Sequence, residues 1–245
     1  MTDPASDARA TSFGQQAGAY DRGRPEYPAE AVAWLIGDAH DVVDVGAGTG
    51  KLTRAIAGSG RNVTAVDPDA TMLATLTRNS PAISTLVGTA EHLPLPDASA
   101  DELTFGQAWH WVDPATASRE AGRVLRPGGV LGLIWNIRDR SEPWVQELVG
   151  LMESSAAENL VQGDGPVVTE PFGPLESRAF AWTRELSVEQ LTEMVTSRST
   201  IIAAPAGERA AILAEVHELG DRVSDGHGML RLPYVTHVFR ARKAG

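Results

Sequence analysis

A glycine-rich turn between a short apolar run and a helical stretch constrains the fold of this chain more than any other segment. The turn, Gly46-Ala47-Gly48-Thr49-Gly50, follows a predicted strand at 41–45 and precedes a predicted helix at 51–57. Glycine tolerates a positive φ and has no Cβ, so a ligand can lie directly against the main chain. A dinucleotide-binding loop would have glycine at position 51, where this chain has lysine. The spacing therefore favours a nucleoside-type cofactor, and a tight turn without a ligand is the plainer alternative.

Strands and helices alternate along the first half of the chain. Further strands are predicted at 62–66, 83–87, 102–105 and 130–135, and further helices at 29–36, 71–78 and 115–125. Short apolar strands separated by amphipathic helices predict a parallel sheet with helices on both faces. After residue 136 the pattern changes to a helix at 143–158, a Gly/Pro-rich loop at 162–174, a strand at 179–186, helices at 188–197 and 208–219, and a strand at 234–239.

The chain has no internal repeat and no linker long enough to separate two domains. We therefore expect a flexible tail over residues 1–12 and a single domain over 13–245. Within that domain, the mixture of aromatic residues, Gly, Arg and Pro near the start predicts an N-terminal arm over 13–36. The change of pattern after the fifth strand predicts a lid or side lobe over about 137–205.

Composition excludes several functional classes. The 245 residues carry a formal net charge of -11, so we expect neither nucleic acid nor a membrane surface as partner. The absence of cysteine excludes disulfides, thiolate chemistry and cysteine-based zinc sites, and is compatible with a cytoplasmic location. The histidines show no metal-ligand spacing with carboxylates, so no metal is expected. The polar N-terminus lacks the apolar core of a signal peptide, and we expect a monomer or homodimer.

A carboxylate follows the second predicted strand. Asp67 comes directly after residues 62–66, and an acidic side chain at this position can accept hydrogen bonds from both hydroxyls of a ribose. The alternative is that Asp67 caps the helix that begins near 69–71.

Four blocks then occur in a characteristic order: Val-Asp-Val-Gly-Ala-Gly-Thr-Gly at 43–50, Val-Asp-Pro at 66–68, Gly-Thr-Ala-Glu-His-Leu-Pro at 88–94 and Arg-Val-Leu-Arg-Pro-Gly-Gly at 123–129. Together they resemble the class I S-adenosylmethionine-dependent methyltransferases, over roughly residues 13–136. The segments at 20–25, 107–113 and 232–236 are similar to a bacterial subgroup that methylates small molecules.

The resemblance implies a fold and an activity. The fold would be α/β, a doubly wound, mostly parallel seven-stranded sheet with helices on both faces and an antiparallel last strand, as in Rossmann-like methyltransferases. The activity would be transfer of the methyl group of S-adenosyl-L-methionine to an O, N or C nucleophile of a small-molecule acceptor by in-line displacement, leaving S-adenosyl-L-homocysteine. The alternatives are a module that binds the cofactor without methylating, and an NAD-type oxidoreductase on a Rossmann-like sheet.

The resemblance also implies roles for individual residues. Asp44 would hold the methionine ammonium group, and Asp67 the ribose hydroxyls. The backbone of Gly46, Ala47, Gly48 and Gly50 would pass beneath the methionine and ribose. The other implied contacts are Pro68 and Met72 beside the adenine, Thr89, Ala90 and Glu91 at its rim, Gln107 near the methionine, and Arg24 and Tyr20 at the methionine carboxylate. Many relatives have Asp at the position of Thr89, whose hydroxyl is a weaker acceptor.

The segment Trp109-His110-Trp111 follows the fourth predicted strand. If the strand continued, His110 would point away from both tryptophans. Two indoles near an activated methyl group suggest a water-poor substrate wall, in which a catalytic His110 would orient or deprotonate the acceptor. The alternative is that the tryptophans belong to the core and His110 is structural. Trp135 and Asn136, at the end of the fifth strand, are further candidates for the substrate pocket.

Overall fold

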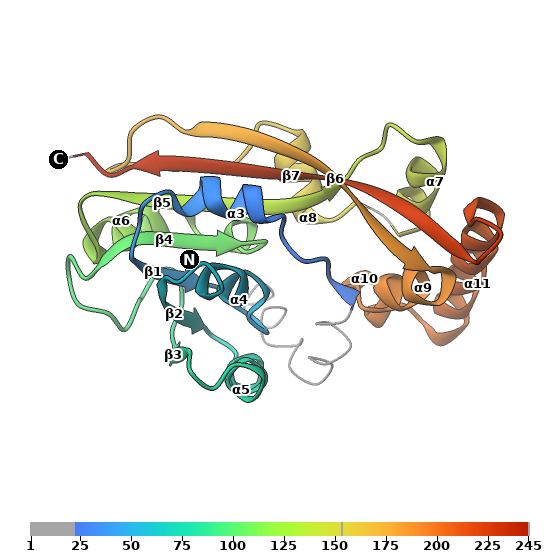
Figure 1. Ribbon diagram of the computed structural model, residues 1–245, viewed down its shortest axis with the longest axis horizontal. Coiled ribbons are helices and arrows are strands. Elements are labelled where there is room, and N and C mark those ends of the chain that lie inside the picture. Colours follow the sequence, from blue (N-terminus) through green and yellow to red (C-terminus); the bar gives the residue numbers. More distant parts are fainter. Residues whose placement is uncertain (1–22, 153, 245) are drawn as a thin grey trace.

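The computed structural model describes residues 23–152 and 154–244, and it is organised around a seven-stranded sheet (Figure 1). The strands are β1 (Asp41–Val45), β2 (Asn62–Asp67), β3 (Ser84–Val87), β4 (Ala100–Gly106), β5 (Leu125–Arg138), β6 (Glu176–Ser187) and β7 (Met229–Arg242). Their order is β3-β2-β1-β4-β5-β7-β6. The first five strands are parallel, and β7 pairs antiparallel with both β5 and β6. The expected fold class, with its antiparallel last strand, is confirmed.

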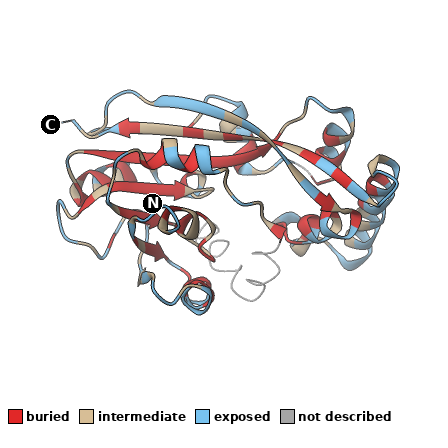
Figure 2. Ribbon diagram, in the orientation of Figure 1, coloured by how far each residue is buried: buried red, intermediate tan, exposed pale blue. Residues whose placement is uncertain are grey.

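Helices cover both faces of the sheet (Figure 1). One face carries α3 (Ala29–Ile36), α4 (Lys51–Ala57) and α5 (Ala70–Asn79), and the other carries α6 (Pro114–Val124) and α8 (Ala156–Gln162). Each face of the sheet has its own hydrophobic core, and the side chains of β1 alternate between them. Val42 packs on the face that α3 and α4 cover, while Val43 and Val45 pack on the face that α6 and α8 cover. Figure 2 shows the central strands as mostly buried. This burial on both faces explains the apolar runs of the parallel strands.

The β6–β7 hairpin continues past the carboxyl ends of the parallel strands, where it carries a separate hydrophobic core. Its members include the fully buried Leu148, Leu186, Leu191, Val216 and Leu232. We call this part the side lobe, made of the outer ends of β6 and β7 with α7 (Pro143–Met152), α9 (Val188–Thr196), α10 (Ser199–Ala203) and α11 (Ala206–Val223). In the described part of the chain, no helix combines the length and apolarity that a bilayer crossing requires.

Several local predictions differ from the structure. The helix expected over 143–158 is broken, because Ser155 caps α8: its hydroxyl accepts a hydrogen bond from the Glu158 N–H at 3.2 Å, while the Glu158 carboxylate accepts one from the Ser155 N–H at 2.8 Å. Residues 109–111 form a 3-10 turn and do not continue β4. Strand β5 begins at Leu125, before the strand predicted at 130–135, and its pairing with β4 contains a register shift. Helix α10 was not predicted.

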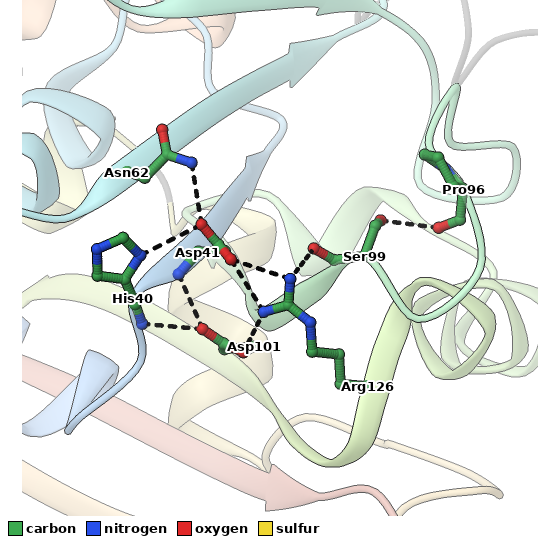
Figure 3. A network of polar contacts seen from close by, with 7 residues as sticks. All are labelled: His40, Asp41, Asn62, Pro96, Ser99, Asp101 and Arg126. Carbon is green, nitrogen blue, oxygen red and sulfur yellow. Dashed lines mark hydrogen bonds and ion pairs between the residues drawn. The ribbon is translucent and has the colours of Figure 1, made fainter.

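A polar network joins the amino ends of β1, β2, β4 and β5 (Figure 3). The guanidinium of Arg126 donates to Oδ2 of Asp41 at 2.9 Å and to the carboxylate of Asp101. Asn62 Nδ2 donates to Oδ1 of Asp41 at 3.0 Å. These hydrogen bonds from Asn62 and Arg126 lower the pKa of Asp41 to about 2. The network therefore holds together the amino ends of these strands, at the edge of the sheet opposite the glycine loop.

Candidate active site

The glycine loop leaves β1 at the carboxyl edge of the sheet, and its three glycines have positive φ angles. Gly46, Gly48 and Gly50 have φ of 69°, 56° and 89°. A Cβ on Gly46 would lie 2.6 Å from the Cβ of Ala108, so a side chain there would collide with the β4 connection. A Cβ on Gly48 would meet nothing within 4 Å, because that side of the loop is open. The loop thus leaves room for a ligand against its backbone.

Asp44 is a buried carboxylate beneath this loop. It is 1% exposed, and its oxygens accept hydrogen bonds from the hydroxyls of Thr53 at 2.5 Å and Thr104 at 3.3 Å. Burial outweighs these two bonds and raises the pKa of Asp44 to about 7. A shift of this size corresponds to roughly 4 kcal/mol against the ionised form. A cationic ligand group placed beside Asp44 would relieve that cost.

Asp67, the last residue of β2, joins the glycine loop to the following turn. Its Oδ2 accepts a hydrogen bond from the Gly48 N–H and its Oδ1 accepts one from the Asp69 N–H, each at 2.8 Å. The cap of α5 is Asp69, whose carboxylate accepts from the N–H groups of Thr71 and Met72. Asp67 is therefore not the helix cap, and burial raises the pKa of this 7% exposed carboxyl.

A first cavity, here called the loop cavity, lies above the glycine loop. It brings together residues from the arm, the loop, α4 and the ends of β4 and β5. Asp44, three of the loop residues predicted to bind cofactor, Arg24 and Gln107 all line it. Its lining residues are Arg24, Pro25, Tyr27, Asp44, Gly46, Ala47, Gly48, Thr49, Lys51, Leu52, Gly106, Gln107 and Asn136.

The described part of the N-terminal arm crosses between the side lobe and the glycine loop (Figure 1). At one end Arg184 of β6 donates to the Gly23 carbonyl at 2.9 Å. Further along, Lys51 Nζ donates to the Glu26 carboxylate at 2.6 Å, and Asn136 Nδ2 donates to the Glu26 carbonyl at 3.1 Å. Lys51, which stands where a dinucleotide loop would have glycine, thus anchors the arm over the cavity.

A second cavity of about 260 Å³, the lobe cavity, adjoins the first. The two share Arg24, Pro25, Gln107 and Asn136 as lining residues. Gln107 adopts a φ of 58° and donates from Nε2 to the Asn136 carbonyl at 3.1 Å, which fixes this shared wall. The remaining lining residues are His110, Trp111, Ile137, Arg138, Ser154, Ser155, Ala156, Ala157, Glu158, Met194, Arg198, Thr200 and Tyr234.

The four residues predicted for a substrate pocket separate into two groups. Trp111, which is 41% exposed, and Asn136 line the lobe cavity. Trp109 is buried, donates from its indole to the Val167 carbonyl at 2.9 Å and packs edge-on against Phe105. Trp135 is also fully buried, and neither it nor Trp109 lines the two cavities described above. The structure places both of these in the core.

His110 lines the lobe cavity and is held as a neutral imidazole. The Trp135 indole N–H donates to its Nδ1 at 3.4 Å, so the proton of the neutral ring lies on Nε2. Burial, and after it the positive charge of Arg24, lowers the pKa of His110 to about 4. In this state His110 is a hydrogen-bond donor to the cavity and a poor base.

The residues predicted around an adenine follow β2 and β3 at the same edge of the sheet, but they do not line the loop cavity. Met72 and Ala90 are buried, Glu91 is partly buried, and Pro68 and Thr89 are exposed. The Thr89 backbone pairs with His92 in a tight turn. Tyr20 lies outside the described residues.

Some lining residues were not predicted from the sequence. The Tyr27 side chain covers Gly106, since a Cβ on that glycine would lie 2.9 Å from the tyrosine hydroxyl. Arg138 is the last residue of β5, and ligands bind at the carboxyl ends of parallel strands. Its place at the site could therefore have been predicted from the sequence. The sequence gives no such indication for Glu158 and Arg198, because only the packing of the side lobe brings them to the cavity.

Comparison with known proteins identifies the family. Residues 43–133 match the family described as "Methyltransferase domain". An uncharacterized methyltransferase of Mycobacterium tuberculosis is 44% identical over 237 residues, covering 95% of this chain and 96% of that protein. This protein is a class I S-adenosylmethionine-dependent methyltransferase. An uncharacterized methyltransferase of Schizosaccharomyces pombe is 35% identical over 209 residues, covering 82% of this methyltransferase and 83% of its own length.

A solved structure agrees with the family assignment. The putative type II methyltransferase from Anaeromyxobacter dehalogenans superposes with a TM-score of 0.68 at 26% identity, covering 90% of this methyltransferase and 97% of that chain. The expected family and enzyme class are confirmed. The methyltransferase assignment therefore replaces the two alternative interpretations of the glycine loop, an oxidoreductase and a module that binds the cofactor without methylating.

Proposed function

We propose that this methyltransferase binds S-adenosyl-L-methionine in the loop cavity and methylates a small molecule held in the lobe cavity. The observation that carries the proposal is the wall common to both cavities, formed by Arg24, Pro25, Gln107 and Asn136. Two ligands that fill the cavities would meet at this wall, which is what a direct transfer requires. When bound, S-adenosyl-L-methionine supplies a methyl group on a cationic sulfur, which an O, N or C nucleophile can displace in line.

The loop cavity has the chemical groups that such a cofactor needs. Asp44 is a buried carboxylate whose raised pKa suits a ligand ammonium group. Each carboxylate oxygen of Asp67 accepts one hydrogen bond from a backbone N–H and has a further lone pair that can accept one from a ribose hydroxyl. The open side of Gly48 leaves space for the sugar and the methionine chain. Arg24 supplies a cation for the methionine carboxylate.

The adenine would lie where β2 and β3 end. We assign Pro68 and Met72 to one side of it and Thr89, Ala90 and Glu91 to its rim, with Tyr20 approaching from the arm. All five described residues follow strands whose carboxyl ends share the edge of the glycine loop. Thr89 is exposed and able to present its hydroxyl to the adenine amino group.

The acceptor would be positioned by the walls of the lobe cavity. His110 would donate from Nε2 to an oxygen or nitrogen of the acceptor, and Trp111 would exclude water from one side. The arm and the side lobe enclose the site, because both contribute residues to the lobe cavity. A small-molecule acceptor also agrees with the net charge of -11, which disfavours nucleic acid.

The test is a transfer assay with S-adenosylmethionine labelled in its methyl group and a cell extract as the source of acceptors. After separation by size, we expect label in the small-molecule fraction, in a compound heavier by one methyl group, together with S-adenosyl-L-homocysteine. The variant His110→Ala should slow turnover by about tenfold, the value of one lost hydrogen bond, at unchanged affinity for S-adenosyl-L-homocysteine.

Label confined to protein or nucleic acid would overturn the small-molecule assignment. Absence of any labelled product from a protein that binds S-adenosyl-L-homocysteine would overturn methyl transfer. Full turnover by His110→Ala would show that His110 does not position the acceptor.

A further inference from the structure

A chain of three hydrogen bonds crosses the sheet from β6 to the N-terminal arm. The Trp182 indole N–H donates to the Thr236 hydroxyl at 2.9 Å, and that hydroxyl donates to Oδ1 of Asn136 at 2.6 Å. Nδ2 of Asn136 then donates to the Glu26 carbonyl at 3.1 Å. Thr236 of β7 lies directly opposite Asn136 of β5 in the antiparallel pairing of these strands. The outermost strand is therefore connected to the segment that passes over the loop cavity.

The donors and acceptors of this chain all point in one direction. An indole N–H only donates, so the Thr236 oxygen accepts from Trp182 and its single proton goes to Asn136. The Asn136 atom that faces Thr236 must then be the carbonyl oxygen, which turns the NH₂ group toward the arm. The Glu26 carbonyl only accepts, and it would be repelled by the amide oxygen if the amide were turned around. Thr236 therefore sets the orientation of the Asn136 amide.

The central part of the chain is shielded from water. Thr236 is 0% exposed and Asn136 8% exposed, so water does not replace either partner. The Trp182 ring stacks on the ring of Tyr234, with centroids 5.0 Å apart and an angle of 18° between the planes. This stacking fixes where the indole N–H points. A buried hydrogen bond that loses one partner leaves the other unsatisfied, which is costly.

Two contacts hold the arm at Glu26, and they differ in strength. The Glu26 carboxylate pairs with Lys51, but the glutamate side chain is 67% exposed, so solvent screens the pair. The Glu26 carbonyl is held by the buried Asn136 amide. Of the two contacts, the one that depends on Asn136 holds the arm more firmly.

Asn136 also occupies the wall common to the two cavities. Its backbone carbonyl accepts from Gln107 at the end of β4, while its side chain holds the arm, which brings Arg24 and Pro25 to the same wall. The side chain of Asn136 therefore decides whether the arm completes this wall.

We propose that Thr236 is a positioning residue: by fixing the Asn136 amide it keeps the arm closed over the loop cavity and slows the release of S-adenosyl-L-homocysteine. The proposal rests on the proposed function, which places that product in the loop cavity. Thr236 lines neither the loop cavity nor the lobe cavity, so it acts through Asn136. Without the hydroxyl, the indole N–H and the amide oxygen lose their partner, and the amide is free to turn away from the arm.

The test is the variant Thr236→Val, which keeps the branched shape of the side chain and removes the hydroxyl. In stopped-flow measurements, S-adenosyl-L-homocysteine should dissociate about tenfold faster, with little change in its association rate. Hydrogen exchange of the backbone amides of residues 23–27 should also be faster. Thr236→Ser restores the hydroxyl and should behave like the unaltered protein in both measurements.

The matched control is Thr192→Val. The Thr192 hydroxyl donates to the Val188 carbonyl at 3.0 Å, within helix α9. This control removes the same chemical group from a threonine that has no contact with the hydrogen-bond chain. It should change neither the dissociation rate nor the exchange of residues 23–27.

A double variant tests whether Thr236 acts through Asn136. Asn136→Leu alone should accelerate both the dissociation of S-adenosyl-L-homocysteine and the exchange of the arm. In this background Thr236→Val should have no further effect, because the amide that it orients is already absent.

An unchanged dissociation rate in a folded Thr236→Val variant would overturn the proposal. So would a Thr236→Ser variant that dissociates as fast as Thr236→Val, or a further acceleration in the Asn136→Leu background. If Thr236→Val does not fold, Asn136→Leu decides, and a normal dissociation rate in that variant would overturn the proposal as well. Failure of the proposed function looks different: the unaltered protein would not bind S-adenosyl-L-homocysteine, although Thr236→Val would still accelerate the exchange of the arm.

Discussion

Two aspartates of the same strand, three residues apart, have opposite electrostatic environments. Asp41 begins β1, is about one-third exposed, and has a pKa lowered to about 2 by hydrogen bonds from Asn62, Arg126 and His40. Asp44 lies near the other end and is buried. Its pKa is raised to about 7, because the desolvation of the carboxylate outweighs the hydrogen bonds from two hydroxyls. A carboxylate with a cationic partner strengthens the fold, whereas one buried without such a partner is available to a ligand.

The same contrast holds for the two edges of the sheet. At the amino edge, the Arg126 guanidinium binds Asp41 and Asp101, so both carboxylates have a cationic partner within the chain (Figure 3). At the carboxyl edge, burial raises the pKa of both Asp44 and Asp67. The first edge holds strands together, and the second is where we place the cofactor. Four substitutions or conditions test this division, in order of decreasing expected effect.

The largest effect is expected from Asp67→Ala at the carboxyl edge. It removes a carboxylate that we expect to accept hydrogen bonds from two ribose hydroxyls, each worth about 1.5–3 kcal/mol when one partner is charged. The affinity for S-adenosyl-L-homocysteine should therefore fall by about 100-fold or more in calorimetric titrations. An unchanged affinity in the folded variant would remove Asp67 from the ribose site.

The second effect is a dependence of cofactor affinity on pH. Asp44 with a pKa of about 7 becomes protonated as the pH falls, and only its ionised form pairs with the ammonium group of S-adenosyl-L-homocysteine. The affinity should fall by about tenfold for each pH unit below 7 and be nearly constant above it. The Asp44→Asn variant should bind more weakly at pH 8 and lose this dependence. A flat profile of the unaltered protein between pH 5.5 and about 8 would contradict the assignment.

The stability of the free protein should show the opposite trends for the two aspartates. Because the folded state raises the pKa of Asp44, this residue lowers the free energy of unfolding as the pH rises from about 4 to about 7. The folded state lowers the pKa of Asp41, so its contribution is present above about pH 4 and is lost as the pH falls toward 2. Urea titrations of Asp41→Asn and Asp44→Asn across this range should separate the two contributions.

The smallest effect is expected from Asp41→Asn at pH 7. The pair with Arg126 is partly exposed and screened by solvent, so the melting temperature should fall by only a few degrees. The affinity for S-adenosyl-L-homocysteine should not change, because Asp41 lies at the far end of β1. A loss of affinity comparable with that of Asp67→Ala would mean that the two edges are coupled and that the division is wrong.

The sequence predicted the surroundings of the glycine loop better than those of the lobe cavity. Strand β1 and helices α3 and α4 have the predicted bounds, because local signals define them: an apolar run, a glycine turn and amphipathic spacing. The loop residues and Asp44 meet in one cavity because they are close in the chain. The break before α8 was also available from the sequence, since Ser155 and Glu158 form the capping-box pattern.

The lobe cavity depends on contacts between distant segments. Arg138 follows a strand, Glu158 lies on α8 and Arg198 lies beyond α9, and no local pattern relates them. The same limit applies to the tryptophans, because Trp109 and Trp111 differ in burial only through the 3-10 turn that follows β4. Tertiary packing, not residue type, decided which aromatic side chain faces the cavity.

The most direct test of the account is calorimetric titration of the unaltered protein at pH 8, once with S-adenosyl-L-homocysteine and once with NAD. The loop cavity predicts saturable binding of one S-adenosyl-L-homocysteine per chain and no saturable binding of NAD. Saturable binding of NAD without binding of S-adenosyl-L-homocysteine would contradict the role given to the glycine loop, Asp44 and Asp67.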